Sequence, residues 1–350
     1  MDGISFSQSI NSSEVTINEA GTTSRRGRLM FNDSLAPVEW SFSTYVRPTT
    51  ANSVVRSPEE ALWAMLVGAV SYDMNGLFYN NATGGSPGSP TFSSNTLGNA
   101  STGSVFNFDG SNVSSFSENW TIWVAFVPTG GTAQYYKLTK AVVNSASIDF
   151  DIEGIATIAW SGFASSIVDS GETGPVTSAE SWNSTALTTT TNFIRNRLST
   201  VNLVDNAVGG KTYTVVLTGG SINIENNITY LTPEELGRVN QPIANITGTR
   251  SISGNMTCYL NTGSPYSGQL YADLLADTST VRNSFDLQIN VGGTTLSQPR
   301  IVLDAPTSHL EVPAINVEDL LTLDIAFHAH GSGLTSDSSD TDEITVVYNT

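Results

Sequence analysis

Hydrophobic and polar residues alternate along most of the chain, in short runs separated by clusters of Gly, Asn, Pro and Ser. Alternate residues of an extended strand lie on the same face, so this pattern predicts strands with one buried and one solvated side. Strands punctuated by turn residues are typical of hairpins and β-sandwiches. The clearest runs are VEWSFSTYV, NWTIWVAFV, IATIAWSGF, SINIENNITYL, SISGNMTCYL, SFDLQINV and LLTLDIAFHA. The predicted fold class is therefore mainly β.

Two segments have the signature of a substantial helix. Residues 57–70, SPEEALWAMLVGAV, begin with a capping box, in which the side chains of Ser57 and Glu60 satisfy amides of the first turn. Residues 267–277, SGQLYADLLAD, offer Ser267 as an N-cap and place leucines four positions apart on one face. Each segment predicts one α-helix.

The order of these elements is repeated along the chain. Each predicted helix follows a strand that ends in an aromatic residue, and Tyr45 matches Tyr259, 214 positions later. Further on, Trp120 matches Phe285, 165 positions later. The two offsets are reconciled by an insertion in the first copy, the Gly/Ser/Asn-rich stretch at about 80–112.

The repeat predicts two tandem β-sandwich domains, each with one flanking α-helix. The first covers residues 1–165 and contains the insertion, which we expect to point outward because it has too few apolar residues to order a core. Residues 166–189 form a linker, and residues 190–350 form the second domain.

Composition excludes several classes of protein. The chain of 350 residues has 14 basic and 32 acidic residues, a net charge of −18, so a basic nucleic-acid groove is not expected. Its one cysteine, Cys258, cannot form an intrachain disulfide, and we expect it to be a small buried residue. The N-terminus shows no signal peptide, and no apolar run approaches the ~20 residues of a membrane span. We expect no membrane association.

The stretch SIDFDIEGIATIAWSGF, residues 147–163, carries acids at three alternate positions. In an unbroken strand, Asp149, Asp151 and Glu153 would share one face, with Phe150 and Ile152 on the opposite, core-facing side. Gly154 weakens this prediction, because it can end the strand or place Glu153 in a turn.

No arrangement of side chains predicts catalysis or a cofactor. The three acids resemble the carboxylate pair of a glycosidase only superficially, because neighbours on one strand face lie about 7 Å apart with no opposing group. Histidines could bind a metal, and aspartates near the C-terminus resemble a calcium loop, but both sets lack ligands, so we expect solvated residues. These residues are His309, His328, His330, Asp337, Asp340 and Asp342.

Residues 218–263, TGGSINIENNITYLTPEELGRVNQPIANITGTRSISGNMTCYLNTG, resemble the major tail tube proteins of long-tailed, non-contractile bacteriophages. The resemblance is to the branch in which two tail-tube domains are fused in one chain. Similar stretches are TNFIRNRLSTVNLV, RIVLDAPTSHLEVPAINVEDLLTLDIAFHA, VEWSFSTYVRP, SPEEALWAMLVGA and residues 147–163. It spans most of the chain except residues 80–112 and 165–190.

This resemblance implies a structural virion protein without enzymatic activity or cofactor. Its domains would join side by side, so that the inner sheets form one large β-barrel around a lumen. The chain would form trimeric, pseudo-hexameric rings that stack into the tail tube, made in the cytoplasm of the host bacterium. It also implies contacts with the tape measure, tail tip and tail terminator proteins, while DNA only passes through.

In such a tube we expect the acids at or near the lumen, where they would repel DNA phosphates. The candidates are Asp149, Asp151, Glu153 and, in the second copy, Glu318, whose neighbours Ala314 and Asn316 are also not basic. The alternative is that they face outside solvent or an arginine of a neighbouring subunit.

Two other functions fit a Ser/Thr/Asn-rich β-protein. One is a virion decoration or receptor-binding protein. The other is a secreted carbohydrate-binding protein or enzyme, for which tryptophans would be sugar platforms: Trp40, Trp120, Trp123 and Trp160. The internal repeat favours ring formation, because an adhesin or lectin has no particular need of two like units in tandem.

Overall fold

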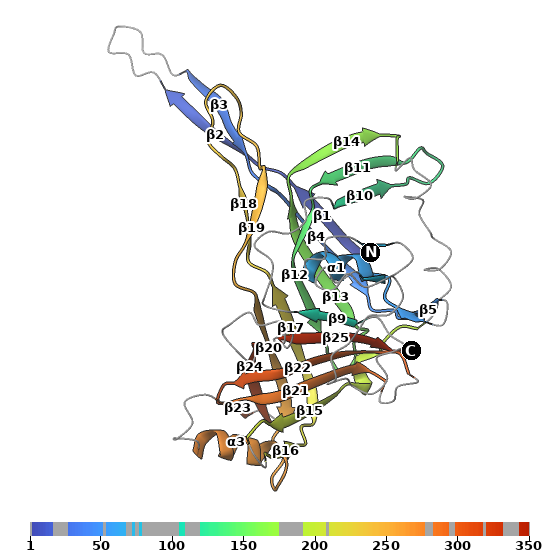
Figure 1. The fold of residues 1–350 in the computed structure, drawn as a ribbon, viewed down its shortest axis with the longest axis vertical. Helices are drawn as coiled ribbons and strands as arrows, with labels where there is room; N and C mark the ends of the chain where they lie inside the picture. The colour runs from blue at the N-terminus through green and yellow to red at the C-terminus, as the bar shows by residue number, and fades with distance from the viewer. Residues whose placement is uncertain are drawn as a thin grey trace.

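The structure of the protein is a computed structural model. It describes residues 2–16, 27–51, 54–67, 72–73, 77–78, 105–108, 120–174, 192–207, 210–276, 283–293, 298–317, 320–331 and 343–349. The molecule is elongated and mainly β, with two long hairpins at one end and helix α3 at the other (Figure 1). This confirms the predicted mainly β class.

A single antiparallel sheet, called the main sheet, runs through the length of the molecule. Its strand order is β1-β4-β13-β12-β17-β20-β24, followed by β22, β21, β15 and β16. The bounds are β1 Asp2–Ser7, β4 Val38–Tyr45, β13 Thr157–Ala164, β12 Val142–Asp149, β17 Leu217–Glu225, β20 Ser251–Tyr259, β24 Leu321–Ala329, β22 Arg300–Leu310, β21 Phe285–Gly292, β15 Thr200–Asp205 and β16 Thr212–Tyr213. A short strand, β23 (Ala314–Val317), also pairs with β24.

The middle of the main sheet is the pairing of β12 with β17, which we call the central joint. Ile148 lies opposite Ile222, and Ala146 lies opposite Ile224; all four are buried. The chain order of elements is similar on both sides. Strand, hairpin, strand and helix run from β1 to α1 and again from β17 to α3, and second-layer strands follow in both cases.

Further strands form a second layer against the main sheet (Figure 1). In the C-terminal half the main sheet itself turns over after β24, and its strands β22 and β21, together with β25 (Ile344–Asn349) and β9 (Val105–Phe108), form this layer. In the N-terminal half a separate sheet holds β10 (Thr121–Phe126), β11 (Gln134–Thr139) and β14 (Ser166–Gly171). One continuous hydrophobic core lies between the layers, in which the rings of Trp63 and Trp160 meet edge-on at 5.0 Å.

Both predicted helices are present and shorter than their sequence signatures. Helix α1 spans Glu60–Val67, and helix α3 spans Ser267–Ala276. Ser267 does not cap its own helix. Its hydroxyl donates to the carbonyl of Tyr259 and accepts from the amide of Asn261, so it fixes the loop that precedes α3. A 3-10 turn covers Asn196–Leu198.

Two hairpins project from the main sheet, and we call them the arms (Figure 1). The first contains β2 (Ile10–Thr16) and β3 (Arg28–Leu35), and the second contains β18 (Ile228–Leu231) and β19 (Ala244–Thr247). The arms lie side by side and are joined by a hydrogen bond, in which the Leu35 amide donates to the Asn240 carbonyl over 2.8 Å. Smaller pairs are β5 (Thr49–Ala51) with β6 (Val54–Arg56) and β7 (Tyr72–Asp73) with β8 (Leu77–Phe78).

The insertion expected to be only a surface loop contributes a strand. Residues 105–108 form β9, which pairs antiparallel with β25 from Val105 opposite Val347 to Phe108 opposite Ile344. The sequence VFNF is a short apolar run, interrupted only by Asn107, within an otherwise Gly/Ser-rich stretch, and composition averaged over the insertion hid it. Residues 79–104 and 109–119 lie outside the described residues.

Candidate functional site

Six neighbouring strands of the main sheet, β4, β13, β12, β17, β20 and β24, share one polar face. The side chains of this face share the strand positions that alternate with core residues, and none of them is buried. They are Glu39, Ser41 and Ser43 on β4, Thr157, Ala159 and Ser161 on β13, Ser145, Ser147 and Asp149 on β12, Ser221, Asn223 and Glu225 on β17, Ser251, Ser253, Asn255 and Thr257 on β20, and Thr322, Asp324, Ala326 and His328 on β24. We call this surface the polar face.

Hydrogen bonds between neighbouring strands hold the small side chains of the polar face in place. The Ser221 hydroxyl donates to the side-chain oxygen of Asn255 over 2.7 Å, and the Thr257 hydroxyl donates to the Asp324 carboxylate over 2.7 Å. These bonds fix the orientation of the four side chains within the face.

The charges of the polar face are acidic. Glu39, Asp149, Glu225 and Asp324 carry them, and no lysine or arginine occurs in strands β1, β4, β12, β13, β17, β20, β23 or β24. A surface of this composition repels phosphate groups, because it offers no cation that could replace their counterions.

The prediction that Asp149, Asp151 and Glu153 share one strand face is wrong. Strand β12 ends at Asp149, which is on the polar face, and Asp151 and Glu153 lie in the turn that follows. The Gly154 amide donates to the Asp151 carbonyl and closes this turn. Ile152 is consequently exposed and does not face the core, whereas Phe150 does.

Three acids of the polar face were missed from sequence, and one that was predicted is not described. Glu39, Glu225 and Asp324 each occupy a polar position of an alternating run, VEWSFSTYV, SINIENN and LLTLDIAFHA, so the same periodicity could have found them. Glu318 lies outside the described residues.

The histidines do not gather into a metal site. His328 lies 3.3 Å from the Glu311 carboxylate and opposite His309 in the strand register, while Nδ1 of His330 contacts the carbonyl of Gly331 at 2.9 Å. Within the described residues no group of three or more His, Cys, Asp or Glu side chains is placed to hold a metal ion. The aspartates at 337, 340 and 342 lie outside the described residues.

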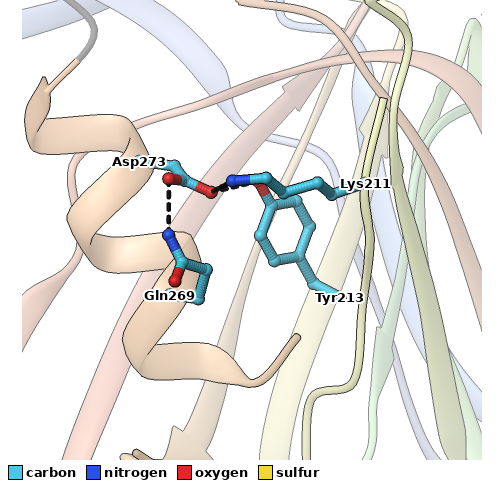
Figure 2. A network of polar contacts seen from close by, with 4 residues as sticks. All are labelled: Lys211, Tyr213, Gln269 and Asp273. Atoms are coloured by element: carbon cyan, nitrogen blue, oxygen red, sulfur yellow. Dashed lines mark hydrogen bonds and ion pairs between the residues drawn. The ribbon is translucent and has the colours of Figure 1, made fainter. Parts of the chain in front are cut away.

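A polar network fixes helix α3 to β16 (Figure 2). The Asp273 carboxylate accepts from Lys211 over 2.7 Å, from the Tyr213 hydroxyl over 2.8 Å and from the Gln269 amide over 2.7 Å. Partial burial raises the pKa of Asp273, but hydrogen bonds from Lys211, Tyr213 and Gln269 outweigh that effect and leave the pKa below its ordinary value. Each member has a partner within the network, so its role is to stabilise the packing of α3 on β16.

Replacing Asp273 with asparagine is expected to lower the free energy of unfolding by about 1 kcal/mol at neutral pH, a modest value because the pair is partly exposed. Since its folded pKa is depressed, the carboxylate stabilises the fold above its ordinary pKa of 3.8 and loses this effect as pH falls through the folded value. Urea unfolding should therefore separate variant and wild type at pH 7, and the difference should shrink as pH falls below 3.8. The exposed Glu172→Gln serves as control, and an equal loss in both variants would contradict the assignment.

Comparisons with known proteins agree with a structural role for these sheets. A model of the family described as phage tail tube protein matches residues 25–329. The chain is also 32% identical over 342 residues to tail tube protein pb6 of Escherichia phage T5, covering 95% of this chain and 67% of that protein. The chain belongs to the phage tail tube protein family. It is a structural component of the phage tail and not an enzyme.

Membership of the tail tube family decides against a carbohydrate-binding function, and most of the tryptophans suggested as sugar platforms lie in the core. Trp40 and Trp160 are buried core residues, and Trp120 packs against the same core. Trp123 is half-buried under the Lys137 ammonium group, which lies 5.4 Å from the centre of its ring. Cys258 is buried as expected, and burial raises the pKa of its thiol to about 11. Within the described residues, no helix combines the length and apolar character needed to cross a membrane.

One buried acid of this tail tube protein stands apart from the polar face. Glu59, which precedes α1, accepts a hydrogen bond from the Tyr348 hydroxyl over 2.8 Å, and that hydroxyl accepts from the Trp63 indole over 2.8 Å. Burial raises the pKa of Glu59 to about 7, although the bond from Tyr348 opposes this. The contact joins the first helix to the last strand, β25, across almost the whole sequence.

Proposed function

We propose that this tail tube protein forms trimeric rings, that the rings stack into the tube, and that the polar face lines the channel through which DNA passes. The observation that carries the proposal is the central joint. At this joint β12 pairs with β17, so that two sets of strands with a similar order lie edge to edge in one continuous sheet, which supports the proposal. Repeating the same joint between chains closes a ring and leaves no free edge in the main sheet.

The strand order of the main sheet supports the proposed repeat. Strands β1-β4-β13-β12 of the first set correspond in order and direction to β17-β20-β24 and β22 with β23 of the second. The pairing of β4 with β13 corresponds to that of β20 with β24, because Phe42 opposite Trp160 matches Met256 opposite Ile325. This supports tandem domains at 1–165 and 190–350, joined by residues 166–189. Three chains would then give a pseudo-sixfold ring.

The two ends of the strand series β1-β4-β13-β12-β17-β20-β24-β23 match the two strands of the central joint. Strand β1 corresponds to β17, and through their pairing with β24 the residues of β23 correspond to those of β12. By this correspondence Ile315 takes the place of Ile148. Ile148 is 1% exposed because β17 covers it, whereas Ile315 is 42% exposed in the single chain. We infer that β1 of the next chain covers Ile315, with Phe6 in the position of Ile222.

The ends of the molecule support stacking of rings. The arms expose apolar side chains, including Met30, Phe31 and Leu236, and the opposite end exposes Ile152 and Leu320 beside the turns of the main sheet. Apolar surface at both ends favours head-to-tail contact between rings, since burying it releases water from both partners. Tape measure, tail tip and tail terminator proteins are the proposed partners inside and at the ends of the tube, on the basis of the family resemblance.

Negative-stain electron microscopy of the purified full chain tests this function directly. Tubes of uniform diameter are the expected result, built from rings of three chains. Compact monomers under all conditions, or open filaments without a channel, would overturn the proposed assembly.

Placing the polar face in the channel predicts an effect of charge reversal. Tubes of Asp149→Lys/Asp324→Lys should bind short double-stranded DNA, with an affinity that falls steeply between 50 and 200 mM salt as counterions are released. Wild-type tubes should bind none. Fluorescence anisotropy with labelled DNA provides the measurement.

The control for this charge reversal is Glu172→Lys, an exposed acid after β14 that is not on the polar face. It should leave DNA binding at the wild-type level. Similar binding by tubes of the control and of the double variant, each with intact tubes, would show that the polar face does not line the channel. Asp151 and Glu153, in the turn after β12, are proposed to lie at the rim of the channel.

A further inference from the structure

The outermost strand of the second layer has a covered edge in one half of the chain and a free edge in the other. Strand β14 pairs with β11, with Val168 opposite Lys137, and β25 pairs with β22 in the same way, with Val347 opposite Val302. The far edge of β25 carries β9, whose Val105 lies opposite Val347. Among the described residues, no strand pairs with the far edge of β14.

Exposure of the matching side chains reflects this difference. Val347 is 4% exposed beside β9, whereas Val168, its counterpart on β14, is 43% exposed. The residues opposite them differ in the same direction, since Val302, opposite Val347, is buried and Lys137, opposite Val168, is only half-buried. The same kind of surface therefore occurs twice in the chain, once occupied by a strand and once open.

Strand β14 lacks the usual features that prevent strand addition. Free edges in soluble proteins are commonly blunted by lysine, proline or inward-pointing charges, and β14, with the sequence SIVDSG, has neither lysine nor proline. Its single acid, Asp169, accepts hydrogen bonds from the Gln134 side chain over 2.6 Å and from the Gly171 amide over 2.8 Å. These bonds hold the carboxylate within its own sheet, so the edge remains receptive.

We propose that the free edge of β14 binds an extended segment of a different protein, which adds one antiparallel strand to the sheet. The proposal rests on the repeat that underlies the proposed function, since β14 is matched to β25. Each copy of this chain already places its own β9 on its own β25, so this strand is not available to β14 when identical chains assemble.

The occupant of the equivalent edge indicates the chemistry of the partner segment. In β9 the aromatic Phe106 lies opposite Val346, which is a core residue, while Asn107 lies opposite the half-buried Thr345. The partner segment should likewise alternate large apolar with small polar residues. It should also be neutral or basic, because the chain carries a net charge of −18.

Disulfide trapping tests the site and its register. The full-length Val168→Cys variant is incubated in air-saturated buffer, where dissolved oxygen is the oxidant, with a synthetic peptide of residues 103–110, GSVFNFDG, in which Val105 is replaced by cysteine. The native Cys258 is buried and does not compete. Binding in the β9 register brings the two thiols together, so mass spectrometry should detect the mixed disulfide about tenfold or more faster than with Val127→Cys, an exposed control after β10.

Equal trapping at positions 168 and 127 overturns the proposal. So does faster formation of a Val168→Cys homodimer than of the peptide adduct, because the edge then serves a second copy of this chain. Hydrogen exchange of the wild-type protein gives an independent readout, in which the peptide should slow exchange of the amides at 166–171 and leave those of β17 unchanged.

Microscopy of the same Val168→Cys preparation separates this inference from the proposed function. Trapping without tubes supports the β14 site and counts against the tube assembly proposed above. Tubes without trapping support the tube assembly and count against the β14 site.

Discussion

Replacing Ile315 with lysine is expected to abolish ring closure while the single chain remains folded. In the free chain this side chain is 42% exposed, so a lysine there can keep its ammonium group in water and has little effect on folding. In the proposed ring it is covered as Ile148 is covered at the central joint, and burying an unpaired ammonium group costs about 3 kcal/mol or more at each joint. Negative-stain microscopy should show no tubes, and sedimentation should show the monomer.

The matched control for this prediction is Val168→Lys, on β14. Its exposure, 43%, is close to the 42% of Ile315, and it lies in the second layer, away from the edges of the main sheet. This variant should form tubes like the wild type. Normal tubes from Ile315→Lys, or the loss of tubes from both variants, would place the contact between chains elsewhere.

Replacing Glu59 with glutamine is expected to remove a large part of the pH dependence of stability. The folded pKa of Glu59 is raised from 4.5 to about 7, so its contribution to stability is fully present below about pH 4.5 and is lost as pH rises through 7. Between pH 5 and pH 8 the wild type should therefore lose about 2–3 kcal/mol through this residue. Glutamine cannot ionise, and its carbonyl oxygen can still accept the hydrogen bond from Tyr348.

Urea unfolding of the unassembled protein at pH 5 and pH 8 measures this effect. The difference between the two pH values should shrink in Glu59→Gln and stay unchanged in Glu39→Gln, a solvent-exposed glutamate on β4. An unchanged difference in Glu59→Gln would show that the carboxyl is not held in the buried site between α1 and β25.

The buried pair of Glu59 and Tyr348 is part of a second connection between the two halves of the chain, besides the central joint. Strand β25 belongs to the second half of the chain, while α1 and β9 belong to the first, and both contact it. The halves are thus held together by the main sheet on one side of the core and by β9, β25 and α1 on the other. Loss of either contact should weaken the other, because they share one core.

Much of the local structure could be predicted from the sequence. Alternation in VEWSFSTYV and LLTLDIAFHA located β4 and β24 and assigned their buried and polar sides, since a strand side chain's face depends only on its position in the run. The helices at 60–67 and 267–276 were found from periodicity and capping residues, although Ser267 serves the preceding loop. The family was also recognised from sequence, and the comparisons confirm it.

What the sequence by itself determined was therefore the strand periodicity, the acidic and lysine-poor composition and the tail tube family. Tertiary structure alone decided that β12 ends at Asp149 and that Asp151 and Glu153 enter a turn, because this end depends on which strands lie beside it. It alone brought Glu39, Glu225 and Asp324 to one face with Asp149, and VFNF onto the edge of β25. Pairing between strands distant in sequence leaves no local signal, since backbone hydrogen bonds carry no record of their partner in the side chains.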